Sequence, residues 1–184
     1  MTNTTSSEIA YTSFEADGTG NWTGVTGANI VSNTTGITGT KYYTLNTTGL
    51  SIAGLSTTKK YTVTYWSRNG AYAVSGTSDA GYPKNVRTVT LNGISWTLWE
   101  HRVGNTATIT VTGNGAIDEL RLCPADAQMT TYTFIPLVGM STKNEPNNRI
   151  VYYEYDAFGR LKLIKDMNGQ VLKTMDYKYR SSTP

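Results

Sequence analysis

Two Asn-Gly pairs, each placed directly after a run of strand-like residues, limit most strongly what this chain can fold into. Residues 61–68 alternate between the two faces of a strand and lead into Asn69-Gly70, and residues 86–91 lead into Asn92-Gly93. Asn-Gly is a strong signal for a two-residue hairpin turn, because both residues tolerate positive φ angles. The sequence therefore predicts two antiparallel hairpins, the first returning through residues 71–74 and the second through residues 94–103.

The rest of the first two-thirds follows the same plan of short strands separated by turn residues. Threonine is the most frequent residue, and 13 tyrosines and 18 glycines accompany it, which suits pleated surfaces and tight turns. No segment of useful length has apolar residues at the 3.6-residue spacing of an α-helix. Further strands are predicted at residues 9–15, 29–31, 41–45, 106–111 and 116–123. Many short strands at this spacing indicate an all-β sandwich or barrel.

The charge density changes near Pro124. Residues 1–123 hold eight Lys/Arg and seven Asp/Glu, whereas the last 61 residues hold eight and six. Proline cannot donate to a β-ladder and suits the end of a strand. We therefore predict one domain at residues 1–123 and a second segment at residues 124–184.

The second segment contains an internal repeat with a period of about 20 to 24 residues. Aromatic residues and a glycine recur from Tyr132 to Met140 and from Tyr153 to Leu161, and the aromatic start of a third unit appears at Tyr177. The central unit is Tyr153-Glu-Tyr155-Asp156-Ala-Phe-Gly159-Arg160-Leu161, followed by Asp166 and Gly169. In such a unit Asp156 can accept backbone N–H bonds in the turn, and Gly159 permits a positive φ.

This pattern resembles the YD (Rhs) repeat of large bacterial proteins, although the preceding unit has Ile135 in place of the Asp and Met140 in place of the Arg. The resemblance implies stacked β-hairpins within a much longer exported or cell-surface chain. The remainder of that parent chain would be a partner, and open hairpin edges could drive self-association.

Residues 1–123 resemble a carbohydrate-binding jelly roll of the galactose-binding-like class. The features that carry this resemblance occur in the expected order: Ser13-Phe14-Glu15, Trp22, residues 61–66, Trp96 and Ile117-Asp118-Glu119-Leu120. The resemblance implies one structural calcium ion held by Glu15 and Asp118, with Asp17 as a further candidate. The alternative is that both carboxylates simply face water.

The same resemblance points to glycan binding, because sugar rings stack on aromatic faces and their hydroxyls need polar partners. The candidate ligand-binding residues are Trp66, Arg68, Tyr82, Trp99 and His101. Period two places Trp66 with Arg68 on one strand face, and Trp99 with His101 on another. The competing interpretation assigns the tryptophans to the core and gives the lone histidine a structural role.

Composition excludes several other functions. One cysteine and one histidine exclude a disulfide framework and leave little for metal or nucleophilic catalysis, and no Gly-x-Ser-x-Gly motif is present. A dispersed net charge of +3 does not indicate nucleic-acid binding, and no apolar stretch predicts a membrane span. We predict a non-enzymatic, extracellular or cell-surface module that binds or anchors to a glycan. The alternative is a purely architectural sandwich that packs against a YD-repeat shell.

Overall fold

The computed structural model describes residues 8–16, 18–32 and 35–178, and within them the chain is all-β, as predicted. These residues form fifteen strands and one short 3₁₀ turn, and they contain no α-helix. The elements are β1 (Ala10–Thr12), η1 (Gly27–Asn29), β2 (Ile30–Ser32), β3 (Lys41–Leu45), β4 (Leu50–Ala53), β5 (Lys60–Ser67), β6 (Ala73–Val74), β7 (Lys84–Leu91), β8 (Ile94–Gly104), β9 (Thr108–Thr112), β10 (Gly115–Pro124), β11 (Thr131–Ile135), β12 (Gly139–Asn144), β13 (Ile150–Tyr155), β14 (Leu161–Asp166) and β15 (Val171–Thr174).

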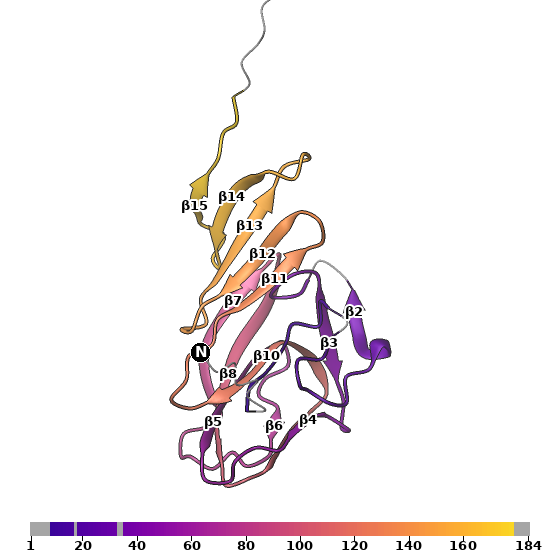
Figure 1. Cartoon of the computed structure of the whole chain (residues 1–184), viewed down its shortest axis with the longest axis vertical. Coiled ribbons are helices and arrows are strands. Elements are labelled where there is room, and N and C mark those ends of the chain that lie inside the picture. The colour runs from indigo at the N-terminus through magenta and orange to yellow at the C-terminus, as the bar shows by residue number, and fades with distance from the viewer. Residues whose placement is uncertain (1–7, 17, 33–34, 179–184) are drawn as a thin grey trace, which may run out of the picture.

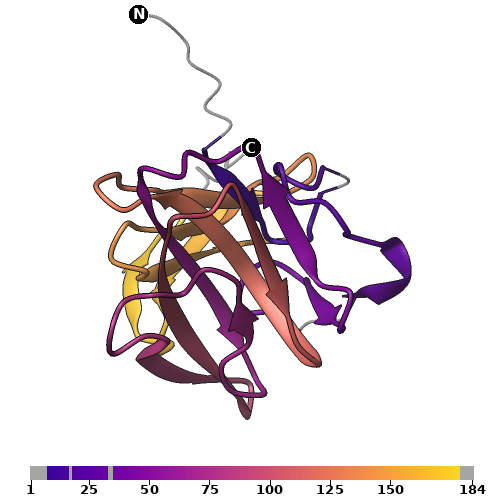
Figure 2. The same ribbon diagram turned by 90° about the horizontal axis from the view of Figure 1, so that it is seen from below.

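The strands form three antiparallel sheets (Figure 1). A seven-stranded sheet has the order β2-β3-β10-β5-β8-β7, with β1 paired to the second half of β10. A three-stranded sheet, β4-β9-β6, faces it and completes a sandwich. A five-stranded meander runs from β11 to β15, and Figure 2 shows it behind the sandwich strands when the molecule is seen from below.

The sandwich core lies between the seven-stranded and three-stranded sheets. Alternation along β5 sends Tyr61, Val63 and Tyr65 into this core, where each is at most 1% exposed. Ile109 and Val111 of β9 meet them from the opposite sheet, as the alternation of residues 106–111 predicts. This is the ordinary construction of a β-sandwich, in which the inner faces of two sheets interdigitate.

A second apolar cluster covers the opposite face of the seven-stranded sheet. Its members come from the sandwich and from the meander, and they are Ile37, Trp66, Val89, Trp96, Leu98, Ala116, Ile150 and Met167, with Tyr42, Leu91, Ile94 and Tyr152 packed around them. We call this set the outer-face cluster. The seven-stranded sheet is therefore covered on both faces, by the three-stranded sheet on one and by the meander on the other.

One of the two predicted hairpins is confirmed and the other is wrong. Asn92 and Gly93, both with positive φ, join β7 to β8 in an antiparallel pair. The chain after Asn69-Gly70 instead leaves the seven-stranded sheet and enters β6, which pairs with β9. The Asn69 side chain accepts a hydrogen bond from Ala116 N (3.0 Å), so this turn is anchored to β10 and carries the chain across the sandwich.

The last two turns of the meander share one design. Asp156 accepts N–H bonds from Phe158 and Arg160, and Asp166 accepts them from Asn168 and Gln170, all at 2.9–3.0 Å. The third residue after each aspartate is a glycine with a positive φ, which is Gly159 in the first turn and Gly169 in the second. The turn roles predicted for Asp156 and Gly159 are confirmed, and the Asp166 turn repeats them.

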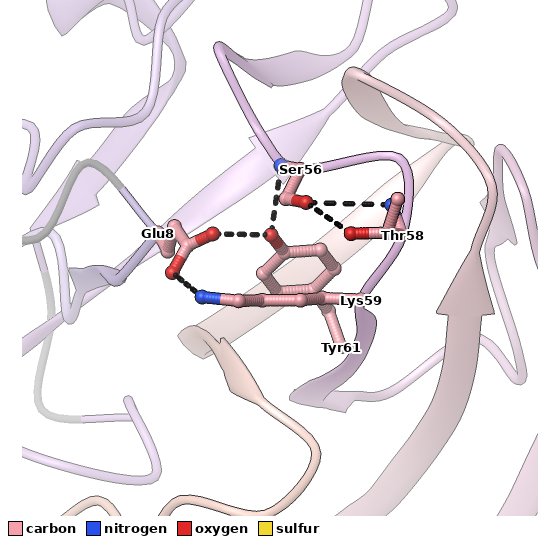
Figure 3. A network of polar contacts seen from close by, with 5 residues as sticks. All are labelled: Glu8, Ser56, Thr58, Lys59 and Tyr61. Atoms are coloured by element: carbon pink, nitrogen blue, oxygen red, sulfur yellow. Dashed lines mark hydrogen bonds and ion pairs between the residues drawn. The ribbon is translucent and has the colours of Figure 1, made fainter.

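A polar network fixes the start of the described chain to the β4–β5 connection (Figure 3). Glu8 accepts hydrogen bonds from Tyr61 Oη (2.9 Å) and Lys59 Nζ (2.7 Å), and Ser56 N donates to the same tyrosine oxygen (2.9 Å). The network closes this end of the sandwich.

Candidate functional site

The residues predicted to bind a glycan lie on opposite faces of the seven-stranded sheet. In the β5–β8 ladder, Trp66 pairs with Leu98, whereas Tyr65 pairs with Trp99. Directly paired residues share a face, so Trp66 belongs to the outer-face cluster and Trp99 to the sandwich core. Trp66 and Arg68 therefore share no surface with Trp99 and His101.

Trp66 and Arg68 have structural surroundings on the outer face. Trp66 is fully buried, so no sugar ring can stack on it. The Arg68 guanidinium lies 4.3 Å from the centre of the Tyr42 ring and 4.4 Å from that of Trp96. It also donates hydrogen bonds to the carbonyl and hydroxyl oxygens of Thr35. Arg68 thereby clamps the loop before β3 onto the outer-face cluster.

His101 is a buried core histidine with both ring nitrogens bonded. Thr77 donates its hydroxyl proton to Val74 O (2.8 Å), which leaves its oxygen to accept a bond from His101 Nδ1–H (3.0 Å). We infer that His101 Nε2 then accepts the hydroxyl proton of Tyr65 at 3.0 Å, in competition with Tyr72 O at 3.2 Å. Burial lowers the pKa of His101 to about 4, so the imidazole is neutral at physiological pH. Trp99 packs half-buried beside this group.

The single histidine gives a specific pH prediction. Its pKa is about 4 in the folded chain and 6.5 when unperturbed. The stability that it contributes is complete above pH 6.5 and declines as the pH falls toward 4, because only the unfolded chain takes up the proton in that range. We expect His101→Gln to remove about 3 kcal/mol of this pH dependence, measured by urea unfolding. An imidazole that titrates near pH 6.5 by NMR would contradict the assignment.

Tyr82 stands apart from the other predicted ligand-binding residues. It lies half-buried in the loop before β7, and its hydroxyl donates to Glu100 at 3.4 Å. Glu100 is also 3.5 Å from Arg102. Of the five residues predicted to bind a glycan, two are buried, one packs against the core, one clamps a loop and Tyr82 lies in a separate loop, so the set makes no common surface.

The predicted calcium ligands do come together around the loop of residues 36–41. Glu15 Oε1 accepts N–H bonds from Thr40 (2.7 Å) and Lys41, and Asp118 Oδ2 accepts them from Ile37 (2.8 Å) and Thr38 (3.2 Å). One loop therefore binds both carboxylates. Asp17, the further candidate, lies outside the described residues. The idea that both carboxylates face water is wrong for Asp118, which is fully buried.

Backbone oxygen atoms gather near the Asp118 carboxylate, around Gly36. A Cβ atom on Gly36 would lie 2.5 Å from Lys41 O, 2.8 Å from Thr38 O and 3.2 Å from Asp118 Oδ2. Burial raises the pKa of Asp118 well above its usual value, and the nearby charges of Glu119 and Glu15 raise it further. Two carboxylates and two carbonyls are hard ligands of the type that calcium prefers, and a cation would relieve the repulsion.

The most densely bonded polar residue is one that the sequence did not single out. The Glu119 side chain is 1% exposed. Its Oε1 accepts hydrogen bonds from Tyr11 Oη (2.7 Å) and Thr38 Oγ1 (2.9 Å). Its Oε2 accepts them from Thr131 Oγ1 and Asn144 Nδ2, both at 2.9 Å. One buried carboxylate thus joins β1, the loop before β3, and the first hairpin of the meander.

A second polar connection runs through Arg121. Its guanidinium donates to Asn148 Oδ1 (2.8 Å) and to the carbonyl of Met129. Arg87 reaches the same turn and donates to Met167 Sδ at 2.9 Å. The meander is therefore held to the sandwich by buried polar bonds as well as by the outer-face cluster.

A signal for this junction exists in the sequence, but it is weak. Asp118, Glu119 and Arg121 place three charges within six residues of an otherwise apolar strand, Ile117–Leu122. Charged residues are almost never fully buried unless they are paired, so such a run in a central strand signals a buried polar junction. Only the strand order shows that its partners come from the second segment.

Comparison with known proteins leaves the chain without an assigned family. No helix in the described part of the chain is long and apolar enough to cross a membrane. Among those residues, no group of three or more His, Cys, Asp or Glu side chains could hold a metal ion. No protein-family model matches the chain, and neither does any curated protein.

Proposed function

We propose that this chain is a non-catalytic architectural module of a large exported or cell-surface bacterial protein, in which the sandwich caps a series of stacked YD-type β-hairpins. The observation that carries the proposal is the outer-face cluster. Ile150 and Met167 of the meander are 1% and 5% exposed, and both are buried with Trp66 and Trp96 of the sandwich. Architecture of this kind is the alternative that the sequence left open.

A cap answers a physical need of hairpin arrays. Each hairpin is too small to bury its own apolar face, so the first unit of a stack needs another surface to cover it. The seven-stranded sheet supplies such a surface, with the Glu119 and Arg121 bonds fixing the hairpin on it. A terminal unit that is apolar inward and polar outward is what repeat arrays require at their ends.

The far edge of the meander provides the place where an array would continue. Every residue of β15 is exposed, including Val171 (55%) and Leu172 (58%). An uncovered strand edge with apolar side chains pairs readily with a further strand. We propose that the next hairpin of the parent chain adds here, and that isolated copies self-associate through the same edge.

The proposal predicts that the hairpins depend on the sandwich. Residues 125–184 produced alone are expected to lack a stable sheet, because Ile150 and Met167 lose the surface that buries them. Amide chemical-shift dispersion and cooperative thermal unfolding would be compared with those of the whole chain. A separate segment that unfolds cooperatively as a monomer would overturn the cap function.

Glycan binding was the first hypothesis from the sequence. It would need side chains other than the five that the sequence analysis selected. Trp66 and His101 are inaccessible, so their replacement is expected to destabilise the fold without removing a sugar contact. A glycan array on the intact chain is expected to be blank for neutral sugars. Selective binding of a neutral glycan would shift the function from architecture to recognition.

We also propose a structural calcium ion at Glu15 and Asp118, with the carbonyl groups of Thr38 and Lys41 as further ligands. An ion there would neutralise two carboxylates and fix the loop of residues 36–41 between the sandwich and the meander. The ion would have a structural role and would take part in no reaction.

Calcium is expected to raise the melting temperature of the chain. Millimolar calcium should stabilise it relative to a chelator by a few degrees, since a ligand that binds only the folded state stabilises it by mass action. Glu15→Gln should abolish this difference, whereas Glu154→Gln, an exposed change in β13, should retain it. Equal melting in calcium and chelator would exclude the ion.

A further inference from the structure

Part of the outer face of the seven-stranded sheet is left uncovered by the meander strands. Six residues form two rows across β10, β5 and β8 there: Cys123-Thr62-Arg102 and Arg121-Thr64-Glu100. The rows follow from direct pairing, so all six side chains point to the same side. The neighbouring positions on β5 and β8 are Trp66 and Leu98, which are buried in the outer-face cluster, whereas these two rows are mainly polar.

The uncovered rows form the floor of a pocket of about 320 Å³. One wall is formed by Ala125, Ala127, Gln128 and Met129 of the linker, and another by Pro146, Asn147 and Asn148 of the β12–β13 turn. Arg102 donates to Ala125 O (3.3 Å) and Arg121 to Asn148 Oδ1 (2.8 Å), so both walls are fixed to the floor. The pocket exists only because the meander docks on the sandwich.

The charges in this pocket are unequal. Arg102 and Arg121 face a single lining carboxylate, Glu100, which lies 3.5 Å from Arg102. Arg121 is 5% exposed, its hydrogen-bond partners in the described chain are neutral oxygens, and its buried Nε has none. Burial lowers the pKa of its guanidinium, and the negative charge of Glu119, which makes no hydrogen bond to it, only partly opposes this shift. A buried cation without a contacting anion is costly, which favours a bound anion.

We propose that this pocket binds the carboxylate of a small hydroxylated acid of hexuronate size, beside Arg121. The net charge of the lining side chains matches a single negative charge, and Glu100 disfavours a dianion. The hydroxyl groups of Thr62 and Thr64 have no partner among the described residues, and Glu100 can accept from a ligand hydroxyl. A volume near 320 Å³ is at the small end of ligand pockets and suits one sugar-sized molecule.

The test is an NMR titration of the intact chain with D-glucuronate and D-galacturonate at constant ionic strength. Saturable shifts are expected for amides of the pocket floor with at least one uronate, and none with D-glucose. Thr64→Val, which keeps the shape of the strand residue, should weaken binding about fivefold. Thr108→Val, an exposed change in the three-stranded sheet, is the matched control and should bind as the wild type does.

Glu100→Gln separates a binding role from a structural one. Removal of the only lining carboxylate should tighten uronate binding about threefold, and loss of structure could not produce such a gain. Saturable uronate binding with this pattern supports the proposal. The proposal is overturned if neither uronate gives saturable shifts. It is also overturned if glucose gives equal shifts, which would indicate a site for neutral molecules, or if inorganic phosphate does, which would indicate a general anion site.

Discussion

A chain that ends after Gln128 is expected to melt well below the intact protein, to bind hydrophobic dyes and to self-associate. Truncation would expose Trp66 and Trp96, which are fully buried in the intact chain. The apolar surface uncovered on these two tryptophans costs about 2 kcal/mol each. Removal of Thr131 and Asn144 also takes two hydrogen bonds from Oε2 of Glu119, each with a net value of about 1 kcal/mol. The sum, on the order of 5 kcal/mol, approaches the whole stability of many domains.

The matched control for this truncation keeps the meander and changes only its exposed edge. Val171→Ser with Leu172→Ser should leave the melting temperature nearly unchanged, because both side chains are more than half exposed. The two proteins would be compared by thermal unfolding and by light scattering. A truncated chain that melts like the intact one and stays monomeric would show that the sandwich is an independent domain.

The strands were predictable because their pattern is local, whereas the arrangement of their faces was not. Residues 41–45 were placed at the observed bounds of β3, and the turn at Asn92-Gly93 was recognised from its dipeptide. The alternation predicted for residues 61–65, and the inward direction predicted for Ile109 and Val111, were also correct. What the sequence lacks is the register between strands, and the pairing of Trp66 with Leu98 puts Trp99 on the other face. A one-residue offset between two correctly predicted strands thus separated the proposed glycan site into two unrelated groups.

The buried carboxylates show a second limit of local patterns. Period two would place Asp118 and Glu119 on opposite faces, one inward and one outward. In the structure the β10 register shifts between Asp118 and Arg121, and Glu119 adopts a positive φ of 52°. The bulge buries every residue from Ile117 to Leu122. Bulges of this kind depend on tertiary partners, which here arrive from the second segment of the chain.

Glu119→Ala is expected to destabilise the protein by about 3–5 kcal/mol, because it removes the acceptor shared by four donors. Tyr11 and Thr38 would lose their partner on the sandwich side, and Thr131 and Asn144 would lose theirs on the meander. One effect opposes the loss, since the negative charge of Glu119 raises the pKa of Asp118 and its removal relieves that repulsion. Four buried donors without acceptors outweigh this single relief.

Glu119→Gln tests whether hydrogen bonding or shape explains the effect. The glutamine amide keeps one acceptor oxygen. Asn144 Oδ1 is buried without a hydrogen-bond partner. If the Asn144 amide rotates, this oxygen faces the new NH₂ group and can accept a hydrogen bond from it. We expect a loss of about 1–2 kcal/mol for this change, measured by urea unfolding. Glu154→Ala, which removes an exposed carboxylate paired with Lys165, should cost less than about 1 kcal/mol. If Glu119→Ala cost no more than Glu154→Ala, the meander would be held by apolar contact alone, and Glu119 would not be the junction that its four hydrogen bonds indicate.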